Sequence, residues 1–393
     1  MPNKPSKIPS SPYFGSGPCK KHPGWKASDL QSALISRSHR APEGVARIQR
    51  LLDLTREILE VPKDYTIAMV PGSGTGAVET ALWNFLGRRP VDIFAWDVFG
   101  KLWVTDAIEQ LSLSPIQAFV EDFGHLPDLT QYTGNHDCVF TFNGTTGGVM
   151  VPHLDWIPDD RQGLTICDAT SSAFVIPIDD WHKLDITCFS WQKGFGGEAA
   201  HGMIIVSPRA MHHLTQFQPR WPIPRLFRLT KAGEIIQSIF EAKTINTPSM
   251  LCVEDAIQGL EWAASIGGKK ALWQRVKCNF DVMDQWITNH SDLEHLAVAS
   301  ASRSKASLCF KLTSAYCKGQ DPGDLIAKIA SSLADLEVAY DIKNHFLAPP
   351  SFRIWCGPTI ETEDLLILTQ WINWALERVR PANSSSFYPQ PHF

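Results

Sequence analysis

Short apolar runs alternate with helix-like stretches along the first half of the chain. The runs are hydrophobic at most positions and lie at residues 66–70, 91–96, 138–142, 164–167, 186–190 and 203–206. Strands that are apolar on both faces are typical of a buried parallel sheet, and strands that alternate with helices, such as 77–86 and 102–111, indicate βαβ units. The pattern predicts an α/β fold with a mostly parallel sheet. Because the last run follows a glycine-rich loop, we expect an antiparallel edge strand or hairpin partner there.

The pattern changes after Pro248. The expected elements are helices at 250–266, 269–288, 322–336 and 363–378, with strands at 307–312 and 352–355. This succession is typical of a smaller α+β domain of common size. We therefore expect an N-terminal arm at 1–14, a large domain at 15–255, a small C-terminal domain at 256–380 and a poorly ordered tail at 381–393.

Composition excludes several classes of protein. The chain has 393 residues and a formal charge of −5, without the basic excess of a nucleic-acid or membrane-surface binder. No apolar stretch approaches the roughly 18 residues of a membrane span, and the polar, proline-rich N-terminus lacks the apolar core of a secretory signal. The nine cysteines include no CxxC pair, so we expect reduced thiols, a cytoplasmic location and no metal site. An α/β enzyme remains.

A glycine-rich turn, Gly72-Ser73-Gly74-Thr75-Gly76-Ala77, follows the first strand and opens a helix. Its backbone N–H groups and the helix N-terminus favour an anion, so phosphate binding is the natural interpretation. The same residues fit the dinucleotide pattern G-x-G-x-x-G/A, with Asp97 at the distance of a ribose-binding acid. A cofactor phosphate, a dinucleotide and a tight turn without ligand all remain open at this point.

Two ionisable residues follow the ends of apolar strands. Asp168 comes directly after the run at 164–167, and Lys193 comes shortly after the run at 186–190. In open parallel sheets, ligands bind at this edge. Burial would lower the pKa of the lysine and favour a nucleophilic amine, and the carboxylate would keep a pyridine ring protonated. The pair indicates pyridoxal phosphate chemistry; the alternatives are a buried ion pair and a lysine that reaches solvent.

The order of motifs along the chain resembles a known family. It consists of the glycine-rich turn, Trp103, Asn143-Gly144-Thr145, Asp168, Ser190-Trp191-Gln192-Lys193 and Asn246-Thr247-Pro248. This order is similar to that of fold-type-I pyridoxal-phosphate aminotransferases and, within their class V, of phosphoserine aminotransferases. The segments Phe14-Gly15-Ser16-Gly17-Pro18 and Ser38-His39-Arg40 resemble that family's first residues and its substrate-binding turn.

The resemblance implies roles for the residues around the cofactor, pyridoxal 5′-phosphate. Lys193 would form the Schiff base and move the substrate proton, and Asp168 would pair with the pyridine nitrogen. Trp103 would stack on the ring; without the resemblance, a core tryptophan is the better interpretation. Gly74 and Thr75 would bind the cofactor phosphate.

Further cofactor contacts are implied for Thr145 and for Gln192, the latter beside the phosphate. Asn246 and Thr247 would reach the phosphate of the neighbouring subunit's cofactor, which implies a homodimer with shared active sites. Without the resemblance, Asn246-Thr247-Pro248 predicts a helix start, with Thr247 as N-cap and Pro248 in the first turn.

Substrate residues are implied in the same way. Arg40 and Arg353 would hold the carboxylates of glutamate, because guanidinium groups bind carboxylates bidentately. His39 and His345 would help to bind the phosphate of phosphoserine. Thr75 departs from the family pattern, since better-known members carry an arginine there. The candidates for a compensating cation are Lys101, Lys243 and Arg228.

The resemblance implies amino transfer between O-phospho-L-serine and 2-oxoglutarate, giving 3-phosphohydroxypyruvate and L-glutamate in serine biosynthesis. A phosphorylated hydroxythreonine of pyridoxine biosynthesis is an expected second substrate. The nearest alternative is another class-V enzyme, such as an alanine–glyoxylate or serine–pyruvate aminotransferase. An NAD-dependent dehydrogenase and a non-catalytic paralogue that binds without cofactor are alternatives from other classes.

Overall fold

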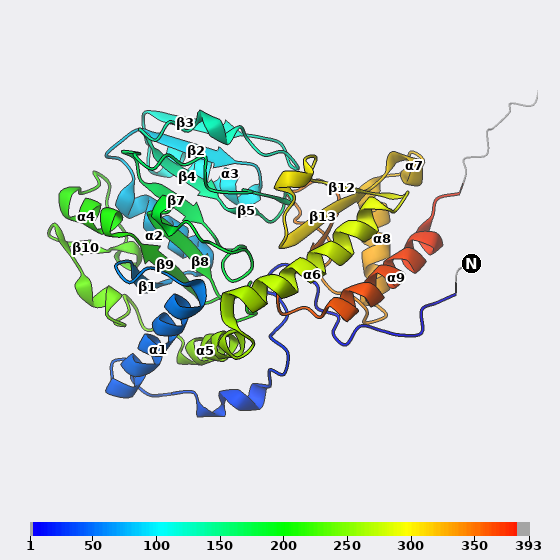
Figure 1. The fold of residues 1–393 in the computed structure, drawn as a ribbon, viewed down its shortest axis with the longest axis horizontal. Helices are drawn as coiled ribbons and strands as arrows, with labels where there is room; N and C mark the ends of the chain where they lie inside the picture. Colours follow the sequence, from blue (N-terminus) through cyan, green and yellow to red (C-terminus); the bar gives the residue numbers. More distant parts are fainter. Residues whose placement is uncertain (1–2, 383–393) are drawn as a thin grey trace, which may run out of the picture.

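The computed structural model describes residues 3–382 and contains a seven-stranded sheet in its larger part (Figure 1). The strand order is β1-β9-β8-β7-β4-β2-β3. The strands are β1 (Thr66–Pro71), β2 (Val91–Ala95), β3 (Ile116–Val120), β4 (Asp137–Thr141), β7 (Thr165–Asp168), β8 (Ile186–Ser190) and β9 (His201–Val206). Two short strand pairs lie outside this sheet: β5 (Asn143–Gly144) with β6 (Val149–Met150), and β10 (Thr230–Lys231) with β11 (Glu234–Ile235).

Five neighbouring strands, from β3 to β8, are parallel, which confirms the α/β class predicted from the sequence. Strand β9 runs antiparallel to both of its neighbours, β1 and β8. The expected hairpin partner is therefore present, but it is not an edge strand. Strand β3 escaped prediction because it lies at the sheet edge and is half-exposed, so it lacks the continuous apolar run of a buried strand.

Helices cover both faces of the sheet and enclose two apolar cores. Along β1, Ile67 and Met69 belong to one core, whereas Ala68 and Val70 belong to the other. This alternation explains why the strands read as apolar on both faces. The helices of this part are α1 (Pro42–Leu59), α2 (Ser73–Phe85), α3 (Val98–Thr105), which continues as a π-helical turn (Asp106–Gln110), and α4 (Pro208–Gln216).

The C-terminal part contains a second, antiparallel sheet of β12 (Leu293–His295), β13 (Ser307–Leu312) and β14 (Phe352–Trp355). Its helices are α5 (Met250–Ser265), α6 (Gly268–Thr288), α7 (Ser314–Cys317), α8 (Pro322–Ala334) and α9 (Thr362–Val379). Figure 1 shows α5 beside α1, below the large sheet, and α6 running from there toward the C-terminal sheet. The predicted boundary after residue 255 falls inside α5, which packs on both α1 and α6, and the division into two domains stays a prediction.

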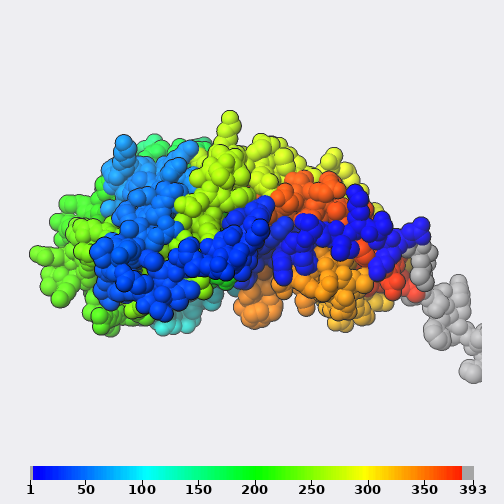
Figure 2. All heavy atoms as spheres, turned by 90° about the horizontal axis from the view of Figure 1, so that it is seen from below, coloured from blue at the N-terminus to red at the C-terminus, as the bar shows by residue number. Residues whose placement is uncertain are grey.

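The first residues of the described chain run along the C-terminal part, as the dark blue spheres of Figure 2 show. Ser10 donates hydrogen bonds to Asp364 from its backbone N (2.6 Å) and its hydroxyl (2.7 Å), and the carbonyl of Phe14 accepts from the Trp355 N–H (3.0 Å). The expected tail at 381–393 lies almost entirely outside the described residues. Between residues 3 and 382, no helix is long and apolar enough to cross a membrane, and no cluster of side chains suits a metal ion.

Candidate active site

A cavity of about 240 Å³ opens at the carboxyl ends of the parallel strands. It brings together seven of the residues predicted from the sequence, which come from five separate segments of the chain. These residues are Gly74, Thr75, Trp103, Thr145, Asp168, Gln192 and Lys193. This placement agrees with the rule that open parallel sheets bind ligands at this edge.

The glycine-rich turn places the start of α2 in the lining of this cavity. Gly72 has a φ of 86°, a left-handed conformation that suits glycine, and no side chain caps the helix. A Cβ atom at Gly74 would lie 2.6 Å from the hydroxyl of Thr170 and 3.2 Å from that of Ser190. The uncapped N–H groups and the two hydroxyls therefore surround a space that only glycine leaves open, and this is a suitable place for an anion.

Asp168 is held in a fixed orientation at the end of β7. Its Oδ2 accepts a hydrogen bond from the indole N–H of Trp103 (3.0 Å), and its Oδ1 accepts from the backbone N–H of Thr170 (3.0 Å). Burial raises the pKa of this carboxyl, while the hydrogen bonds from Thr170 and Trp103 oppose the rise. The indole N–H thus has a role that the sequence did not suggest, because it orients the carboxylate.

Lys193 is buried, and its Nζ donates to the carbonyl of Ser16. Burial lowers the pKa of this lysine, and the neighbouring Arg353 lowers it further. Gly17 packs directly on the lysine side chain, since a Cβ there would lie 2.9 Å from Cε of Lys193. The N-terminal segment therefore closes one wall of the cavity, and nothing in the local sequence reveals this long-range contact.

Arg353 lies on β14 and is close enough to influence Lys193. Burial lowers the pKa of its guanidinium, and within the described chain the side chain has neither a hydrogen bond nor an ion pair; its Nε is enclosed without a partner. His345 stands nearby, with its ring 6.3 Å from that of Phe99, which lines the cavity. The positive charge of Arg353 lowers the pKa of His345 after the larger effect of burial. Neither Arg353 nor His345 is in the lining of the cavity, but both lie next to residues that line it, so the positive charge of Arg353 makes this side suited to anions.

His39 and Arg40 lie elsewhere. They line a separate cavity of about 170 Å³ together with Val45, Lys243 and Thr244. Within one chain, the structure does not bring them to the cavity that contains Lys193.

Asn246 and Thr247 follow Thr244 after one residue, and neither of them lines the Lys193 cavity. Helix α5 begins just beyond it, but the N-cap is Ser249, whose hydroxyl accepts from the N–H of Cys252 (3.3 Å). The alternative helix start with Thr247 as N-cap is therefore wrong by two residues. The helix begins where a hydroxyl meets a free N–H group, and Pro248 precedes it.

The three candidates for the cation that Thr75 does not supply lie in different places. Lys243 lines the cavity with His39 and Arg40, whereas Lys101 lies over the ring of Phe123, with 4.7 Å from Nζ to the ring centroid. Arg228 donates to the carbonyl of Ile223. None of the three lines the Lys193 cavity among residues 3–382.

Asp97 is an additional acidic residue of the site. Its Oδ1 accepts from the N–H of Gly100 (2.8 Å) and caps α3, but its Oδ2 is buried without a partner in the described part of the chain. Burial, with a smaller effect of Asp168, raises the pKa of Asp97 to about 6. The sequence offered this residue as a ribose ligand of a dinucleotide.

The sheet topology contradicts that dinucleotide interpretation. In a dinucleotide-binding fold, the strand before the glycine turn lies in the middle of a parallel sheet, at the point where the strand order reverses. Here β1 lies at the edge and pairs only with the antiparallel β9.

The Lys193 cavity also has lining residues that were not predicted. Thr170 and Ser171 are examples, although they lie within three residues of Asp168 in the sequence.

Comparison with known proteins adds sequence and fold relatives, although no family model matches the chain. The phosphoserine aminotransferase of Methanosarcina mazei is 46% identical over 377 residues, which are 96% of this chain and 100% of that protein. The crystal structure of a phosphoserine aminotransferase from Cytophaga hutchinsonii has a TM-score of 0.79 at 19% identity and covers 93% of this chain and 98% of its own. An alanine–glyoxylate aminotransferase from Nostoc sp. has a TM-score of 0.75 at 18% identity, covering 96% and 98%. The two structural likenesses show a shared fold.

Proposed function

Because the chain belongs to the phosphoserine aminotransferase family, we propose that it is a pyridoxal-phosphate-dependent enzyme that transfers the amino group of O-phospho-L-serine to 2-oxoglutarate. The products are 3-phosphohydroxypyruvate and L-glutamate, as in serine biosynthesis. The observation that carries this proposal is the buried Lys193 in one cavity with Asp168 and the uncapped start of α2. The NAD-dependent dehydrogenase is excluded by the family and by the edge position of β1.

The cavity suits pyridoxal phosphate in three respects. The start of α2 and the space beside Gly74 would hold the phosphate, with the hydroxyls of Thr170 and Ser190 close by. Asp168 would face the pyridine nitrogen, and Lys193 would attach to the aldehyde. When bound, this cofactor supplies an aldehyde that takes up the amino group and a ring that withdraws electrons from the substrate Cα.

The protein side chains would then control protons and charge. The lowered pKa of Lys193 favours a neutral amine, so its Nζ is suited to take the proton from the substrate Cα and return it. Asp168 would hold a proton on the ring nitrogen through its negative charge, and Trp103 and Thr170 would keep the carboxylate in place. Thr145 and Gln192 line the same cavity, although the Thr145 hydroxyl already bonds to that of Ser307 (2.8 Å).

Arg353 supports an acidic substrate. A buried guanidinium without an ion pair has lost much of its hydration and regains stability when a carboxylate binds bidentately. His345 beside it would contribute to phosphate binding. The Nostoc neighbour shows that the fold itself is compatible with other amino donors, so the substrate has to be tested directly.

The decisive experiment compares kcat/KM for phosphoserine, serine and alanine, each with 2-oxoglutarate and with glyoxylate. A site that desolvates cations for a phosphate rejects a donor without one, and we expect phosphoserine to be preferred by about 10⁴-fold or more. A preference for alanine with glyoxylate would replace this proposal by the alanine–glyoxylate alternative. A protein with neither turnover nor the visible absorbance of bound pyridoxal phosphate would be a non-catalytic paralogue. The same assay with phosphohydroxythreonine tests the second substrate and thereby a role in pyridoxine biosynthesis.

We also propose that the enzyme is a homodimer with shared active sites. His39, Arg40 and Lys243 form a cationic cavity apart from Lys193, next to the segment of Asn246 and Thr247. In a dimer, this cluster would complete the partner's site, with Asn246 and Thr247 on the cofactor phosphate and His39 and Arg40 on the substrate. Lys243 would then supply the cation that Thr75 does not.

Mixed dimers test the shared site. One chain carries Lys193→Ala, the other carries Asn246→Ala with Thr247→Ala, and each homodimer is expected to be inactive. In a mixed dimer one site would carry both defects and the other none, so activity should return to about half. Mixed dimers that form but recover no activity would overturn the sharing of residues between subunits.

A cytoplasmic location completes the proposal. All nine cysteines are free thiols, and most of them are buried. Unpaired cysteines in this number are typical of proteins kept in a reducing compartment.

A further inference from the structure

A second cationic cavity lies at the opposite, amino-terminal end of the parallel strands. It has a volume of about 170 Å³, and four arginines and two histidines dominate its lining. They come from the loop after α2, from the segment before β7 and from α4. These residues are Arg88, Arg89, Arg161, Arg209, His212 and His213. No acidic residue lines this cavity in the part of the chain that the structure describes.

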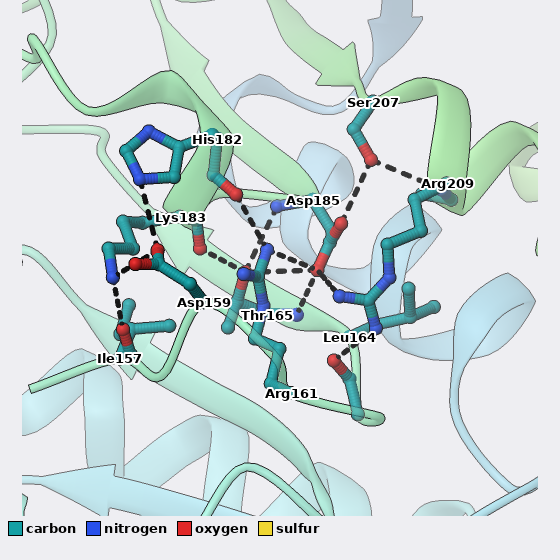
Figure 3. A network of polar contacts seen from close by, with 12 residues as sticks. Ile157, Asp159, Arg161, Leu164, Thr165, His182, Lys183, Asp185, Ser207 and Arg209 are labelled. Carbon is teal, nitrogen blue, oxygen red and sulfur yellow. Dashed lines mark hydrogen bonds and ion pairs between the residues drawn. The ribbon is translucent and has the colours of Figure 1, made fainter.

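The carboxylates beneath the cavity do not balance these charges. Oδ2 of Asp185 forms ion pairs with both Nη2 of Arg161 (3.1 Å) and Nη1 of Arg209 (3.6 Å), as Figure 3 shows. Arg89 pairs with Asp137 (3.3 Å). Arg88 is exposed and has no ion pair within residues 3–382. Four guanidinium groups therefore share two carboxylates, and about two positive charges remain without a partner.

Two buried polar atoms of the same cavity also lack hydrogen bonds. These are Nε of Arg161 and Nε2 of His213, whose residues are only 7% and 4% exposed; neither atom has a partner in the described chain. Leaving such groups unsatisfied is costly, and native proteins rarely do so without a reason. The lowered pKa of His213, about 4, has burial as its main cause and the charges of Arg89 and Arg88 as further causes. His213 is therefore neutral, and because its ring already donates to the backbone of Phe85, its free Nε2 is an acceptor. The unsatisfied donor that calls for a negatively charged acceptor is Nε of Arg161, beside guanidinium groups that outnumber the carboxylates.

We propose that this cavity binds a phosphate dianion, either as inorganic phosphate or as the phosphoryl group of a small metabolite. A phosphate carries close to the two negative charges that the cavity lacks and offers several acceptor oxygens to converging guanidinium groups. The proposal is independent of the transaminase function, because none of these residues lines the Lys193 cavity.

The test is a titration of the holoenzyme with inorganic phosphate, followed through the NMR signals of ¹³C-labelled histidine rings. His212 is exposed, and its signal is assigned by its loss in His212→Gln. We expect a saturable shift of the His212 signal in the wild-type enzyme. The cofactor's absorbance reports separately on any phosphate that enters the Lys193 cavity.

Arg88→Gln is the informative variant, because Arg88 is exposed and unpaired among the described residues and its loss should not disturb folding. Removing one charged donor should weaken phosphate binding by about tenfold or more. The matched control is Arg378→Gln, which removes the same charge from an exposed position on α9 and should leave the affinity unchanged. A missing shift, or equal weakening in the two variants, would mean an adventitious ion only and would overturn the proposal. Glycerol phosphate in place of phosphate distinguishes the two sources: tighter binding identifies a metabolite, and equal binding identifies the free ion.

Discussion

Strands β7 and β8 have a buried charge near each end, and of Asp185 and Lys193 only Asp185 has an ion pair within residues 3–382. At the amino-terminal ends, Asp185 accepts from Arg161 (3.1 Å) and from the Thr165 N–H (3.0 Å) on one oxygen, and from the Ser207 hydroxyl (3.0 Å) on the other (Figure 3). At the carboxyl ends, Lys193 meets only a backbone carbonyl.

Lysines show the same contrast. Lys183, at the amino-terminal end of β8, donates to the carbonyl of Ile157 (2.6 Å) and pairs with Asp159 (2.5 Å). Lys193 and Arg353 have no ion pair within residues 3–382, and Oδ2 of Asp97 has no hydrogen bond there. The charged side chains that have a partner hold two strands and their loops in place. Those without a partner can still form an ion pair or hydrogen bond with a ligand. For these buried lysines, an ion pair therefore separates the structural residue from the functional one, which burial alone does not do.

The strongest test of this distinction removes one lysine from each end. Lys193→Ala should lower turnover by about 10⁴-fold or more, because both proton transfer and covalent attachment are lost, while the unfolding temperature should not fall. Lys183→Ala should do the reverse, with a lower unfolding temperature and normal turnover per folded molecule. Steady-state transamination and thermal unfolding measure the two effects. A folded Lys193→Ala variant with nearly normal turnover would refute the catalytic assignment.

The next test neutralises the satisfied carboxylate. Asp185→Asn leaves Arg161 buried without its counter-charge and places an amide N–H₂ against donors from Thr165 or Ser207. Breaking a buried pair in this way costs about 3–5 kcal/mol of unfolding free energy. Urea unfolding monitored by circular dichroism measures the loss. A change below about 1 kcal/mol, the value of an exposed pair, would show that this network does not stabilise the fold.

The sequence predicted most of the buried strands, because continuous apolar runs between helices leave few other arrangements. The strands it missed carry little hydrophobic pattern: β3 is a half-exposed edge strand, β12 has three residues, and β5, β6, β10 and β11 have two residues each. Strand β9 was recognised as antiparallel, but its position between β1 and β8 depends on long-range pairing that no local pattern encodes.

The residues of the candidate site also fall into those that the local sequence predicted and those that it did not. Lys193, Asp168 and the glycine-rich turn were predicted because each follows a strand at the binding edge of the sheet. Gly17 was not, because its contact with Lys193 joins segments far apart in the chain. The sequence also grouped His39 and Arg40 with Arg353, whereas in one chain His39 and Arg40 line a separate cavity and Arg353 lies close to Lys193. Chemistry at strand ends can thus be predicted from local pattern, but contacts between distant segments cannot.

The smallest expected effect concerns the unsatisfied carboxylate, and it should have the opposite sign to that of Asp185→Asn. Burial raises the pKa of Asp97 from 3.8 to about 6, so between these values the folded protein binds more protons than the unfolded one. The free energy of unfolding therefore falls as the pH rises from about 4 to about 6, because ionised Asp97 is destabilising. Asp97→Asn removes this loss and keeps an oxygen that can accept from the Gly100 N–H and cap α3.

We expect Asp97→Asn to be more stable than wild type by about 1–2 kcal/mol at pH 8 and less stable by about 1 kcal/mol at pH 4, where only the cost of the new amide remains. The gain is less than the full pKa shift implies, since the new amide brings a buried N–H without a partner. Urea unfolding of the cofactor-free protein at both pH values measures the difference, and Asp185→Asn serves as the control that loses stability. A gap that is the same at pH 4 and pH 8, or a less stable variant at pH 8, would show that Asp97 is satisfied in solution and belongs with the structural charges.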